Sequence, residues 1–509
     1  MLEEEYTLDY FKSEGFERKI CKSCGSAFWT RDPEQEFCGD APPCVTYNFI
    51  GNPVFKPHNV SEMREAFLSF FERHGHTRLE RYPVAARWRD DIYLTIASIA
   101  DFQPFVTSGG VVPPPANPLT ISQPCIRLND LDSVGRSGGR HLTLFEMMAH
   151  HAFNTPEERI YWKDETVALC DEFIKSIGGD PTRVSYKEHP WYGGGNAGAS
   201  VEVLIGGLEV ATLVFMNLGR QKTDKPPVDV NGGVPYYPMR LNIVDTGYGL
   251  ERFVWASKGS PTIYDAVFPE MVSRLMRSAH LENLLDNPEF TKIMGGLSAR
   301  FAGGVMDISG TNLYNLRRKV ADAISVPVDR LERIVVPIEK VYSIADHTRC
   351  LAYMLGDCIV PPSNVREGYL ARLVLRRTLR MMNDLSMDED LGDLIEAQMQ
   401  VVGGSRTLSR TWTRYGRSWR ARRRGTQARL SAGGPDRPED RPELQGKEFP
   451  GASRGGHHPL RLARHPARDG EGGRRRRGRR RGDPRQLLLA DRRDALGGAE
   501  GGEGGRRPA

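Results

Sequence analysis

The chain has 509 residues, and 70 lysines and arginines against 65 aspartates and glutamates give it a formal net charge of +5. That charge is unevenly divided: residues 403–509 hold 27 arginines and one lysine against 12 acidic residues, whereas residues 1–402 are net acidic. No run of 18 or more apolar residues occurs, so a transmembrane helix is excluded. The acidic N-terminus lacks the apolar core of a secretory signal, and the length is typical of about three domains.

Four of the eight cysteines lie close together near the N-terminus, as Cys21, Cys24, Cys38 and Cys44. Clustered cysteines in a long chain without a secretory signal favour a metal site over disulfides and indicate a cytoplasmic protein. The pair Cys21-x2-Cys24 followed by two more thiols is typical of zinc ribbons, in which four thiolates close a structural site. Unligated thiols, or a site that has lost one ligand, are the alternative. We therefore predict a zinc-ribbon-like module over residues 1–55.

Two helices are predicted next along the chain. The first begins with a capping residue at Ser61 and ends near His74–Gly75, because its apolar residues recur at helical spacing and share one face, namely Met63, Ala66, Phe67, Phe70 and Phe71. Residues 156–177 are expected to form a second amphipathic helix that ends at Gly178–Gly179.

Strands and further helices follow. Val201–Ile205 and Leu208–Met216 are predicted strands joined by Gly206–Gly207, which is a hairpin signal. Residues 263–400 show repeated leucine-, methionine- and arginine-rich helical periods. The first part of the chain thus mixes predicted strands with helices, and the later part has predicted helices alone. This order predicts an α+β fold followed by an all-helical domain.

The first segment with candidate chemistry is SQPCIRLNDLD, which places Arg127 on a strand. A flexible, basic, glycine-rich loop follows at Ser133–Gly139, and after it come Arg140, His141 and the triplet Phe145–Glu146–Met147. Strands on both sides of such a loop could present guanidinium groups to a polyphosphate, whose oxygens suit bidentate contacts. An ordinary solvated hairpin is the alternative.

The second segment runs from Asp245 to Arg252 as DTGYGLER. A strand over Leu241–Val244 is expected to lead into a glycine turn and then into a helix that begins near Leu250. The glycines would let the backbone approach a ligand, and the helix N-terminus favours anions. The segment is not a Walker A loop, because no Gly-Lys-Ser/Thr follows. A strand–helix turn with a surface arginine is the alternative.

The two segments together resemble class II aminoacyl-tRNA synthetases. SQPCIRLNDLDSVGRSGGRHLTLFEMM resembles motif 2 of the alanyl-tRNA synthetases, VDTGYGLERF resembles their motif 3, and the helix from Ser61 followed by Pro83 resembles motif 1. LEVATLVFMN and DHTRCLAYMLGDCIVPPSNVREGYLARLVLRR also resemble segments of that family. The cysteine-bearing N-terminus resembles its archaeal branch. The resemblance extends over residues 1–400.

The resemblance implies the antiparallel sheet of class II synthetases with flanking helices over residues 56–270, then a truncated helical domain that binds the tRNA acceptor over residues 271–402. It implies activation of alanine by ATP and Mg²⁺, followed by transfer to tRNA(Ala). The implied catalytic residues are Arg127 and Arg252. The implied ATP-binding residues are Arg127, Arg140, His141, Glu146, Gly249 and Arg252.

The resemblance also implies how alanine is bound. Asp245 would pair with its ammonium group, with Gly247 and Thr212 nearby. Bacterial members carry a Trp-Asn pair where this chain has Ala211 and Thr212. Strand alternation places Thr212 on the same face as Val210 and Val214; a buried threonine bonded to backbone is the alternative. GGGNAG, residues 193–198, matches the family's loop beside the amino-acid pocket, although a plain turn explains it equally well.

Nucleic-acid contacts are predicted in the helical part. Arg372, Arg376 and Arg380 recur every four residues and line one helix face, which either contacts phosphates or is simply solvated. Asn364 matches the family residue that reads the guanine–uracil wobble pair of the acceptor stem.

The resemblance stops near Val402, and no editing signature or C-terminal oligomerisation domain follows, so a monomer is expected. Residues 403–509 contain no valine, isoleucine, methionine, asparagine or cysteine and are expected to be disordered. We interpret them as a frameshifted continuation, because the same one-base shift turns back-translations of residues 457–470 and 483–493 into family-like segments. A genuine arginine- and glycine-rich RNA-binding tail is the alternative. The function is therefore alanine–tRNA ligation, adenylate formation alone, or non-catalytic RNA binding.

Overall fold

The structure is a computed structural model. It describes residues 3–41, 44–103, 114–230, 233–284, 293, 310–357 and 360–401, which all belong to one compact unit, Met1–Ser453. The predicted tail over residues 403–509 lies outside the described residues. The boundaries predicted at residues 55, 270 and 402 remain predictions.

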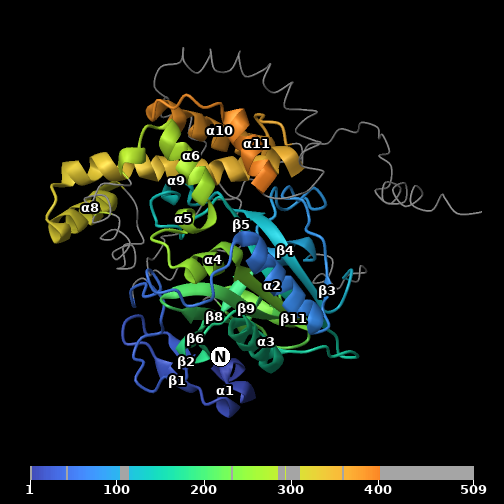
Figure 1. Cartoon of the computed structure of the whole chain (residues 1–509). Coiled ribbons are helices and arrows are strands. Elements are labelled where there is room, and N and C mark those ends of the chain that lie inside the picture. Colours follow the sequence, from blue (N-terminus) through green and yellow to red (C-terminus); the bar gives the residue numbers. More distant parts are fainter. Residues whose placement is uncertain are drawn as a thin grey trace, which may run out of the picture. The chain divides into compact units, whose positions relative to one another are not determined.

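Eleven strands of the described residues form one sheet, in the order β1-β2-β6-β8-β9-β11-β5-β4-β3, with β7 added to β8 and β10 added to β11 (Figure 1). Every pair is antiparallel except β3 with β4. The strands are β1 Glu17–Ile20, β2 Ala27–Thr30, β3 Thr77–Arg78, β4 Leu119–Ile126, β5 Leu144–Asn154, β6 Val184–Glu188, β7 Trp191–Gly193, β8 Asn196–Ile205, β9 Leu208–Gly219, β10 Val228–Asp229 and β11 Pro235–Gly249.

Helices flank this sheet and then continue without further strands as far as the described residues reach, which confirms the α+β prediction. The helices are α1 Asp9–Ser13, α2 Val60–Arg73, α3 Lys163–Ser176, α4 Leu250–Lys258, α5 Ile263–Val267, α6 Pro269–Ser278, α8 Gly310–Ile324, α9 Val328–Asp357, α10 Arg366–Asp384 and α11 Leu391–Val401. None of them is long and apolar enough to cross a membrane.

Two predicted helix starts were wrong. α2 begins before Ser61, because Asn59 is the cap: its side chain accepts from the Glu62 amide at 2.9 Å, and the Glu62 carboxylate accepts from the Asn59 amide at 2.8 Å. α3 begins at Lys163 rather than at residue 156. The preceding residues are held by a hydrogen bond from the Ile160 amide to Asn154 and by packing of Tyr161 against β5 and β11.

The predicted hairpin at Gly206–Gly207 is confirmed, although β8 and β9 extend beyond the predicted strands. Both glycines have positive φ, 63° and 91°. A Cβ on Gly207 would lie 2.6 Å from the Thr46 carbonyl oxygen, so the connection requires glycine.

The predicted glycine turn after Val244 was wrong, because β11 continues to Gly249 before α4 begins at Leu250. The segment stays extended because it pairs on both sides, with β5 and with β9. Its glycines permit close packing instead: a Cβ on Gly247 would lie 3.1 Å from the Met147 sulfur.

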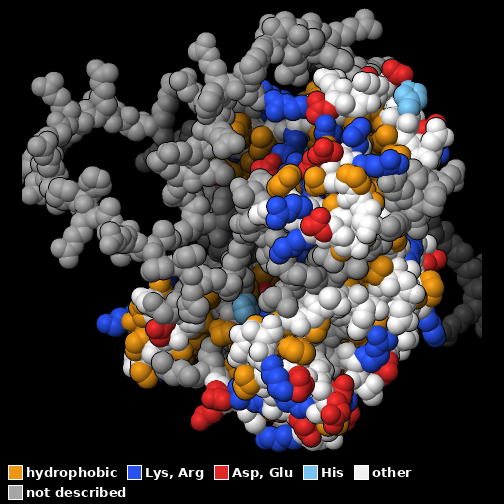
Figure 2. All heavy atoms as spheres, turned by 90° about the vertical axis from the view of Figure 1, so that its left-hand side faces the viewer, with side chains coloured by type: hydrophobic (Ala, Val, Ile, Leu, Met, Phe, Trp, Pro, Cys, Tyr) orange, Lys and Arg blue, Asp and Glu red, His pale blue; other side chains and the backbone are white. Residues whose placement is uncertain are grey.

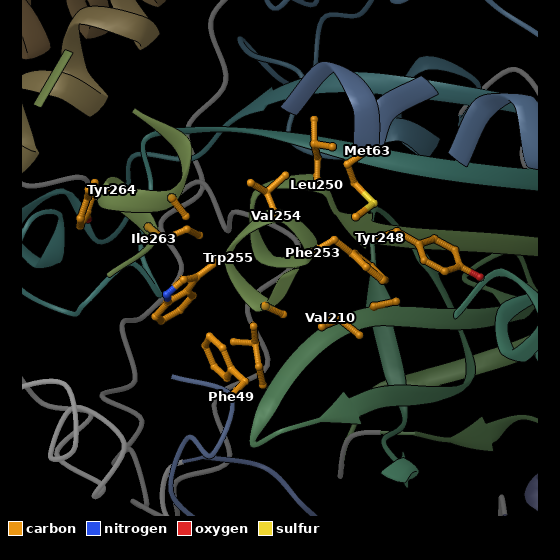
Figure 3. Close-up of a cluster of buried hydrophobic side chains, with 14 of the residues drawn as sticks. Phe49, Met63, Val210, Tyr248, Leu250, Phe253, Val254, Trp255, Ile263 and Tyr264 are labelled. Carbon is orange, nitrogen blue, oxygen red and sulfur yellow. The ribbon is translucent and has the colours of Figure 1, made fainter. Parts of the chain in front are cut away.

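One face of the sheet is filled by α2, α3 and α4. Phe67 of α2 contacts Phe173 of α3 and Tyr248 of β11, with ring centroids 5.0 and 4.9 Å apart. Around α4, Trp255 meets Phe49 edge-on at 4.9 Å (Figure 3). Burial of these aromatic groups fills the space between the helices and this face of the sheet.

A buried ionic cluster attaches α9 to the sheet. Arg349 of α9 donates to Glu251 of α4 at 2.6 Å and to Glu146 of β5 at 3.2 Å. Arg64 of α2 donates twice to Glu146 at 2.7 Å. Next to this cluster, the Asp346 carboxylate accepts from the Thr143 amide at 3.1 Å. Four elements distant in sequence are thereby joined through charged groups.

The glycine-rich loop at residues 133–139 is largely buried rather than solvated, contrary to the expectation of a flexible basic loop. The Gly135 amide donates to the Tyr264 hydroxyl at 2.8 Å, and a Cβ on Gly135 would lie 2.2 Å from the Glu339 carbonyl oxygen of α9. Gly139 packs equally tightly against Ile263. The loop's glycines therefore serve close approach to α5 and α9.

The described surface is mixed in charge on the face that Figure 2 shows. Basic and acidic side chains lie interspersed there, near the helices at the top and near the N-terminal elements at the bottom. Such alternation suits a solvated surface.

Replacing Arg349 by alanine should lower the free energy of unfolding by about 3–5 kcal/mol, because it leaves two buried carboxylates without their shared cation. Denaturant unfolding followed by tryptophan fluorescence measures the effect. Arg333→Ala is the matched control, since this exposed arginine lies on the same helix and donates only to a backbone carbonyl. Equal stability of the two variants would contradict the role of the cluster.

Candidate functional site

A cavity of about 440 Å³ lies against the sheet. Strand alternation explains the floor on β5 and β11, where every second residue faces the cavity while the residues between them face α2, α3 and α4. These floor residues are Phe145 and Met147 of β5, and Asp245, Gly247 and Gly249 of β11. On β9 a register shift against β8 interrupts the alternation opposite Val203 and Leu204, and the lining residues are Glu209, Val210, Ala211, Thr212 and Val214. Thr212 and Val214 line the cavity together, as alternation predicts, whereas Val210 also belongs to the core cluster that contains Leu250 and Phe253 of α4.

Glu146 is not among the residues that line the cavity, so the structure does not bring this predicted ATP-binding residue to the site. It sits between Phe145 and Met147 on β5 and therefore faces the helices. Its carboxylate is bound by Arg64, Arg349 and the Ser122 hydroxyl. Burial raises its pKa, but the two guanidinium groups outweigh burial and hold the pKa below its ordinary value.

Arg127 follows β4 and projects into the cavity. Its Nε donates to the Ile96 carbonyl oxygen at 3.0 Å, and its guanidinium carbon lies 4.9 Å from the ring centre of Phe145. In the described part of the chain no carboxylate lies within ion-pair distance of Arg127. The guanidinium group is thus oriented by a carbonyl oxygen and an aromatic ring, and its positive charge is available to an anionic ligand.

Arg252 comes from the first turn of α4 and is partly neutralised. Its Nη1 donates to the Glu209 carbonyl oxygen at 2.9 Å and to the Glu209 carboxylate at 3.1 Å. Thr212 Oγ1 donates to the same carboxylate at 2.9 Å. Burial raises the pKa of Glu209, but Arg252 and Thr212 outweigh it, so the net pKa is lowered. The side chain of Arg252 is therefore held toward β9.

Arg140 and His141 form another wall of the cavity. The Arg140 guanidinium donates to the carbonyl oxygen of Ala41, in the cysteine-bearing N-terminal part. The carbonyl of His141 accepts from the Tyr264 hydroxyl at 3.1 Å, and its amide donates to the Ser137 hydroxyl at 3.2 Å. Both predicted residues are thus positioned at the site, by neighbouring loops and by α5.

Asp245 is the buried carboxylate of the cavity floor. It is 7% exposed, and burial raises its pKa to about 8. Nδ1 of His151, its partner across β5 and β11, lies 3.5 Å away, and Nε2 of that histidine is 3.1 Å from the Ser98 hydroxyl. Sequence reasoning missed His151; the only signal was its place in the motif 2 strand, directly opposite Asp245.

Two further carboxylates of the site, Glu202 and Glu209, were also missed. Glu202 of β8 accepts from Lys187 at 2.9 Å, and Lys187 donates equally to Asp40. Burial and the charge of Glu209 raise the pKa of Glu202 to about 7 despite Lys187. Single carboxylates on strands carry no motif, and the register shift between β8 and β9 makes simple alternation misplace Glu209, so the sequence held no signal for it.

The glycine-rich stretch at residues 193–198 forms the β7–β8 hairpin and also borders the cavity. Gly194 and Gly195 have positive φ, and Gly193 and Gly194 line the cavity together with Trp191. The stretch is therefore a turn and a wall of the site at once.

The four N-terminal cysteines lie together outside the cavity. Their sulfur atoms are all within 4.8 Å of one another, and those of Cys24 and Cys38 are 3.9 Å apart. Burial raises the pKa of Cys38 and Cys44, whereas amides of Cys24, Cys38 and Ser23 outweigh burial at Cys21 and lower its pKa to about 6. The close approach of four sulfur atoms fits a thiophilic metal ion.

The predicted tRNA contacts lie on and before α10. Arg372, Arg376 and Arg380 are all exposed on one face of this helix. Asn364 is exposed too, and its side-chain oxygen accepts from Arg372. None of the four lines the cavity.

The family model described as tRNA synthetases class II (A) matches residues 62–407, which include all the cavity residues from Arg89 to Ile263. The chain belongs to this family. The match confirms the sequence-based identification of a class II synthetase, a family of ligases, and it ends close to where the predicted tail begins.

Curated relatives are similar over the same part of the chain. The alanine–tRNA ligase of Methanoculleus marisnigri is 94% identical over 403 residues, and that of Methanoregula boonei is 76% identical over 403 residues. In both cases the match covers 79% of this chain and 43% of the relative. The chain thus spans less than half the length of these relatives.

Among solved structures, a pyrrolysyl tRNA synthetase of Desulfitobacterium hafniense matches with a TM-score of 0.28 and 15% sequence identity. The match covers 42% of this chain and 72% of that chain.

Asp245→Asn should stabilise the protein increasingly as the pH rises from about 4 to 8. The folded-state pKa of Asp245 is raised from 3.8 to about 8, so the folded state binds more protons than the unfolded state in this window. Wild-type stability therefore falls as the pH rises, because the unfolded chain loses this proton while the folded state keeps it. The stability difference should grow by at most about 1.4 kcal/mol per pH unit. Unfolding curves of both proteins at several pH values measure it. A pH-independent difference would contradict the raised pKa.

Proposed function

We propose that the chain forms alanyl-adenylate from alanine and ATP and transfers alanine to tRNA(Ala). The observation that supports this function is that one cavity contains Arg127, Arg252 and Asp245, in a chain whose matched part is 94% identical to a curated alanine–tRNA ligase. Non-catalytic RNA binding does not require two arginines and a buried carboxylate in one cavity. Adenylate formation alone is the second candidate, because all three residues serve the first step.

In the first step, a carboxylate oxygen of alanine attacks the α-phosphorus of ATP. An O–P bond forms as the bond to the β-phosphate breaks, and pyrophosphate leaves. We assign Arg127 to the α-phosphate and Arg252 to the adenine and γ-phosphate side, with Arg140 and His141 near the polyphosphate tail. Guanidinium groups already oriented in a cavity stabilise the charge that develops at phosphorus.

Alanine would be held by the β11 side of the floor. The positive charge of the ammonium group would favour the ionised form of Asp245, so the two would pair, while Gly247, lacking a side chain, leaves space for the substrate. Thr212 would contribute at the neighbouring strand. Fixing both reactants in one cavity supplies the proximity that this reaction needs.

Mg²⁺ would add positive charge to the phosphates of ATP. The residues present fit it, because Glu202 and Glu209 bring two carboxylates to the cavity and Mg²⁺ prefers oxygen ligands. We propose these two side chains as its protein ligands.

We also propose that Cys21, Cys24, Cys38 and Cys44 bind one zinc ion. Tetrahedral zinc with Zn–S bonds of about 2.3 Å requires sulfur atoms roughly 3.8 Å apart. The 3.9 Å separation of Cys24 and Cys38 meets this requirement, and the other sulfur atoms lie within 4.8 Å. Four thiolates leave no open position, so the ion would be structural.

The exposed arginine face of α10 is our candidate for contact with the acceptor stem. Phosphate contacts by Arg372, Arg376 and Arg380 would orient the tRNA, and Asn364 beside Arg372 would read the wobble pair.

Arg252→Ala should reduce alanine-dependent ATP–pyrophosphate exchange roughly 10- to 100-fold, because a charge-assisted hydrogen bond contributes about 1.5–3 kcal/mol. Arg240→Ala is the control, since Arg240 lies on β11 but pairs with Glu157 on the surface. Undiminished exchange by the Arg252 variant would disprove its assigned role. Exchange without charging of tRNA(Ala) by the wild type would favour adenylate formation alone.

Cys24→Ser should lower zinc from about one ion per chain to almost none, since a closed site needs all four thiolates. Elemental analysis of the purified protein measures this, and circular dichroism should still report the folded sheet. Cys170→Ala, a cysteine outside the cluster, should keep the metal. Absence of zinc from freshly purified wild-type protein would contradict the proposal.

Changing Arg372, Arg376 and Arg380 together to glutamine should weaken tRNA binding and reduce the slope of log affinity against log salt by roughly 2–3, because each phosphate contact contributes about 0.9. Binding titrations at several salt concentrations measure the slope. Arg333→Gln on α9 is the control. An unchanged slope would show that α10 does not face the RNA.

A further inference from the structure

The cysteine cluster and the cavity share a short stretch of backbone, Cys38–Ala41. The Cys38 carbonyl oxygen accepts from the Ser185 hydroxyl of β6 at 2.8 Å. The Ala41 amide donates to the Gly207 carbonyl oxygen, in the hairpin between β8 and β9, at 3.0 Å. Between these two bonds, Gly39 has a φ of +89°, and a Cβ there would lie 2.8 Å from the Ser185 oxygen. The stretch is therefore pressed directly against the strands that carry the cavity.

Two connections lead from this stretch into the cavity. The carbonyl oxygen of Ala41 accepts from the guanidinium of Arg140, which lines the cavity. The carboxylate of Asp40 accepts from Lys187 at 2.9 Å, and Lys187 donates at the same distance to Glu202, a second lining residue. One basic and one acidic group of the site thus depend on neighbouring residues of a single backbone segment.

The cysteines fix this segment from both ends. Cys38 precedes it directly, and Cys44 follows it, with its amide donating to the Asp40 carbonyl oxygen at 3.1 Å. A metal ion held by both thiolates would close a small ring around Asp40 and Ala41. Closing such a ring removes conformational freedom from the backbone inside it.

We propose that the four-cysteine module is a positioning device for the nucleotide site, in which the bound metal holds the Ala41 carbonyl and thereby orients Arg140. This inference rests on the proposed function, since it places ATP phosphates near Arg140. When the metal is lost, the carbonyl moves, Arg140 samples more rotamers, and ATP binds less tightly. Alanine binding at Asp245 is unaffected, because that residue contacts His151 instead.

Other contacts keep the module attached when the metal is absent. β2 pairs with β6, and Arg31 donates to the buried Asp171 of α3 at 2.9 Å. Phe11 stacks on Trp29 at 4.8 Å. These contacts do not involve the cysteines, so removal of the metal is expected to have a local effect on Cys38–Ala41.

A double-mutant cycle tests this positioning role. The full chain is prepared as wild type, Cys24→Ser, Arg140→Gln and the double variant, and the affinity of each for a non-hydrolysable ATP analogue is measured by calorimetry alongside zinc content. We expect each single variant to bind the analogue about tenfold more weakly, and the double variant to bind it no more weakly than Arg140→Gln alone, since coupled residues are non-additive. Two results would overturn the proposal. One is a double variant whose loss of affinity is the product of the two single losses. The other is a Cys24→Ser variant that loses zinc but binds the analogue as tightly as the wild type.

A second pair of variants keeps every thiol in place. Gly39→Ala pushes a methyl group toward Ser185, so it should weaken binding of the analogue while zinc is retained. Gly25→Ala is the matched control, because Gly25 also has positive φ (+73°) but nothing within 4 Å of an added Cβ. Equal affinities of these two variants would overturn the proposal even if Cys24→Ser fails to fold.

The outcomes separate this inference from the proposed function. If the wild type neither binds the analogue nor exchanges pyrophosphate, the proposed function fails and the inference fails with it. If the wild type does both and the cycle is additive, only the inference fails. The alanine KM provides an internal check, since it should stay within about twofold of the wild type in Gly39→Ala.

Discussion

The shared cation of Arg349 is the interaction on which the site depends. It lies between Glu146 and Glu251. Glu251 itself lines the cavity, and Glu146 lies between two lining residues, Phe145 and Met147. Burying an arginine between two carboxylates costs desolvation, which a hydrophobic replacement would avoid. The cluster instead fixes relative positions. It attaches β5 and the first turn of α4 to the same helix, so the motif 2 and motif 3 segments keep a fixed separation.

Charge in the cavity is divided between groups already paired and groups left for a ligand. Arg252 shares its charge with Glu209, whereas Arg127 is held by a carbonyl oxygen and an aromatic ring. A guanidinium oriented without a carboxylate keeps its full electrostatic potential in a site partly shielded from water. The two arginines therefore differ in their surroundings: Arg252 is fixed by Glu209, whereas no carboxylate of the described residues lies within ion-pair distance of Arg127.

Features of this structure that depend on local chemistry could be predicted from the sequence, and those that depend on distant partners could not. The glycine hairpin between β8 and β9 follows from alternation and φ requirements alone, and so does the face on which Thr212 lies. The helix start was predicted at Ser61 and was wrong, although asparagine followed three residues later by glutamate, as in Asn59 and Glu62, is itself a helix-start signal. Glu146 was predicted at the ATP site, but it lies on the other face of β5. Alternation along a strand shows which residues share a face, but it does not show which of the two faces binds the ligand. Only contacts with Arg64 and Arg349, 82 and 203 residues away, decide it.

β1 stands at one end of the sheet, and no strand among the described residues pairs with its outer backbone groups. Three of its four residues are charged, Glu17, Arg18 and Lys19, and Arg18 is drawn back to Glu188 by two hydrogen bonds. Charged side chains on an open edge discourage a second chain from adding its own strand there. Ile20 is the exception, at 59% exposure. During synthesis, when many nascent copies lie close together, the charged residues of β1 would keep the sheets of different copies from pairing edge to edge.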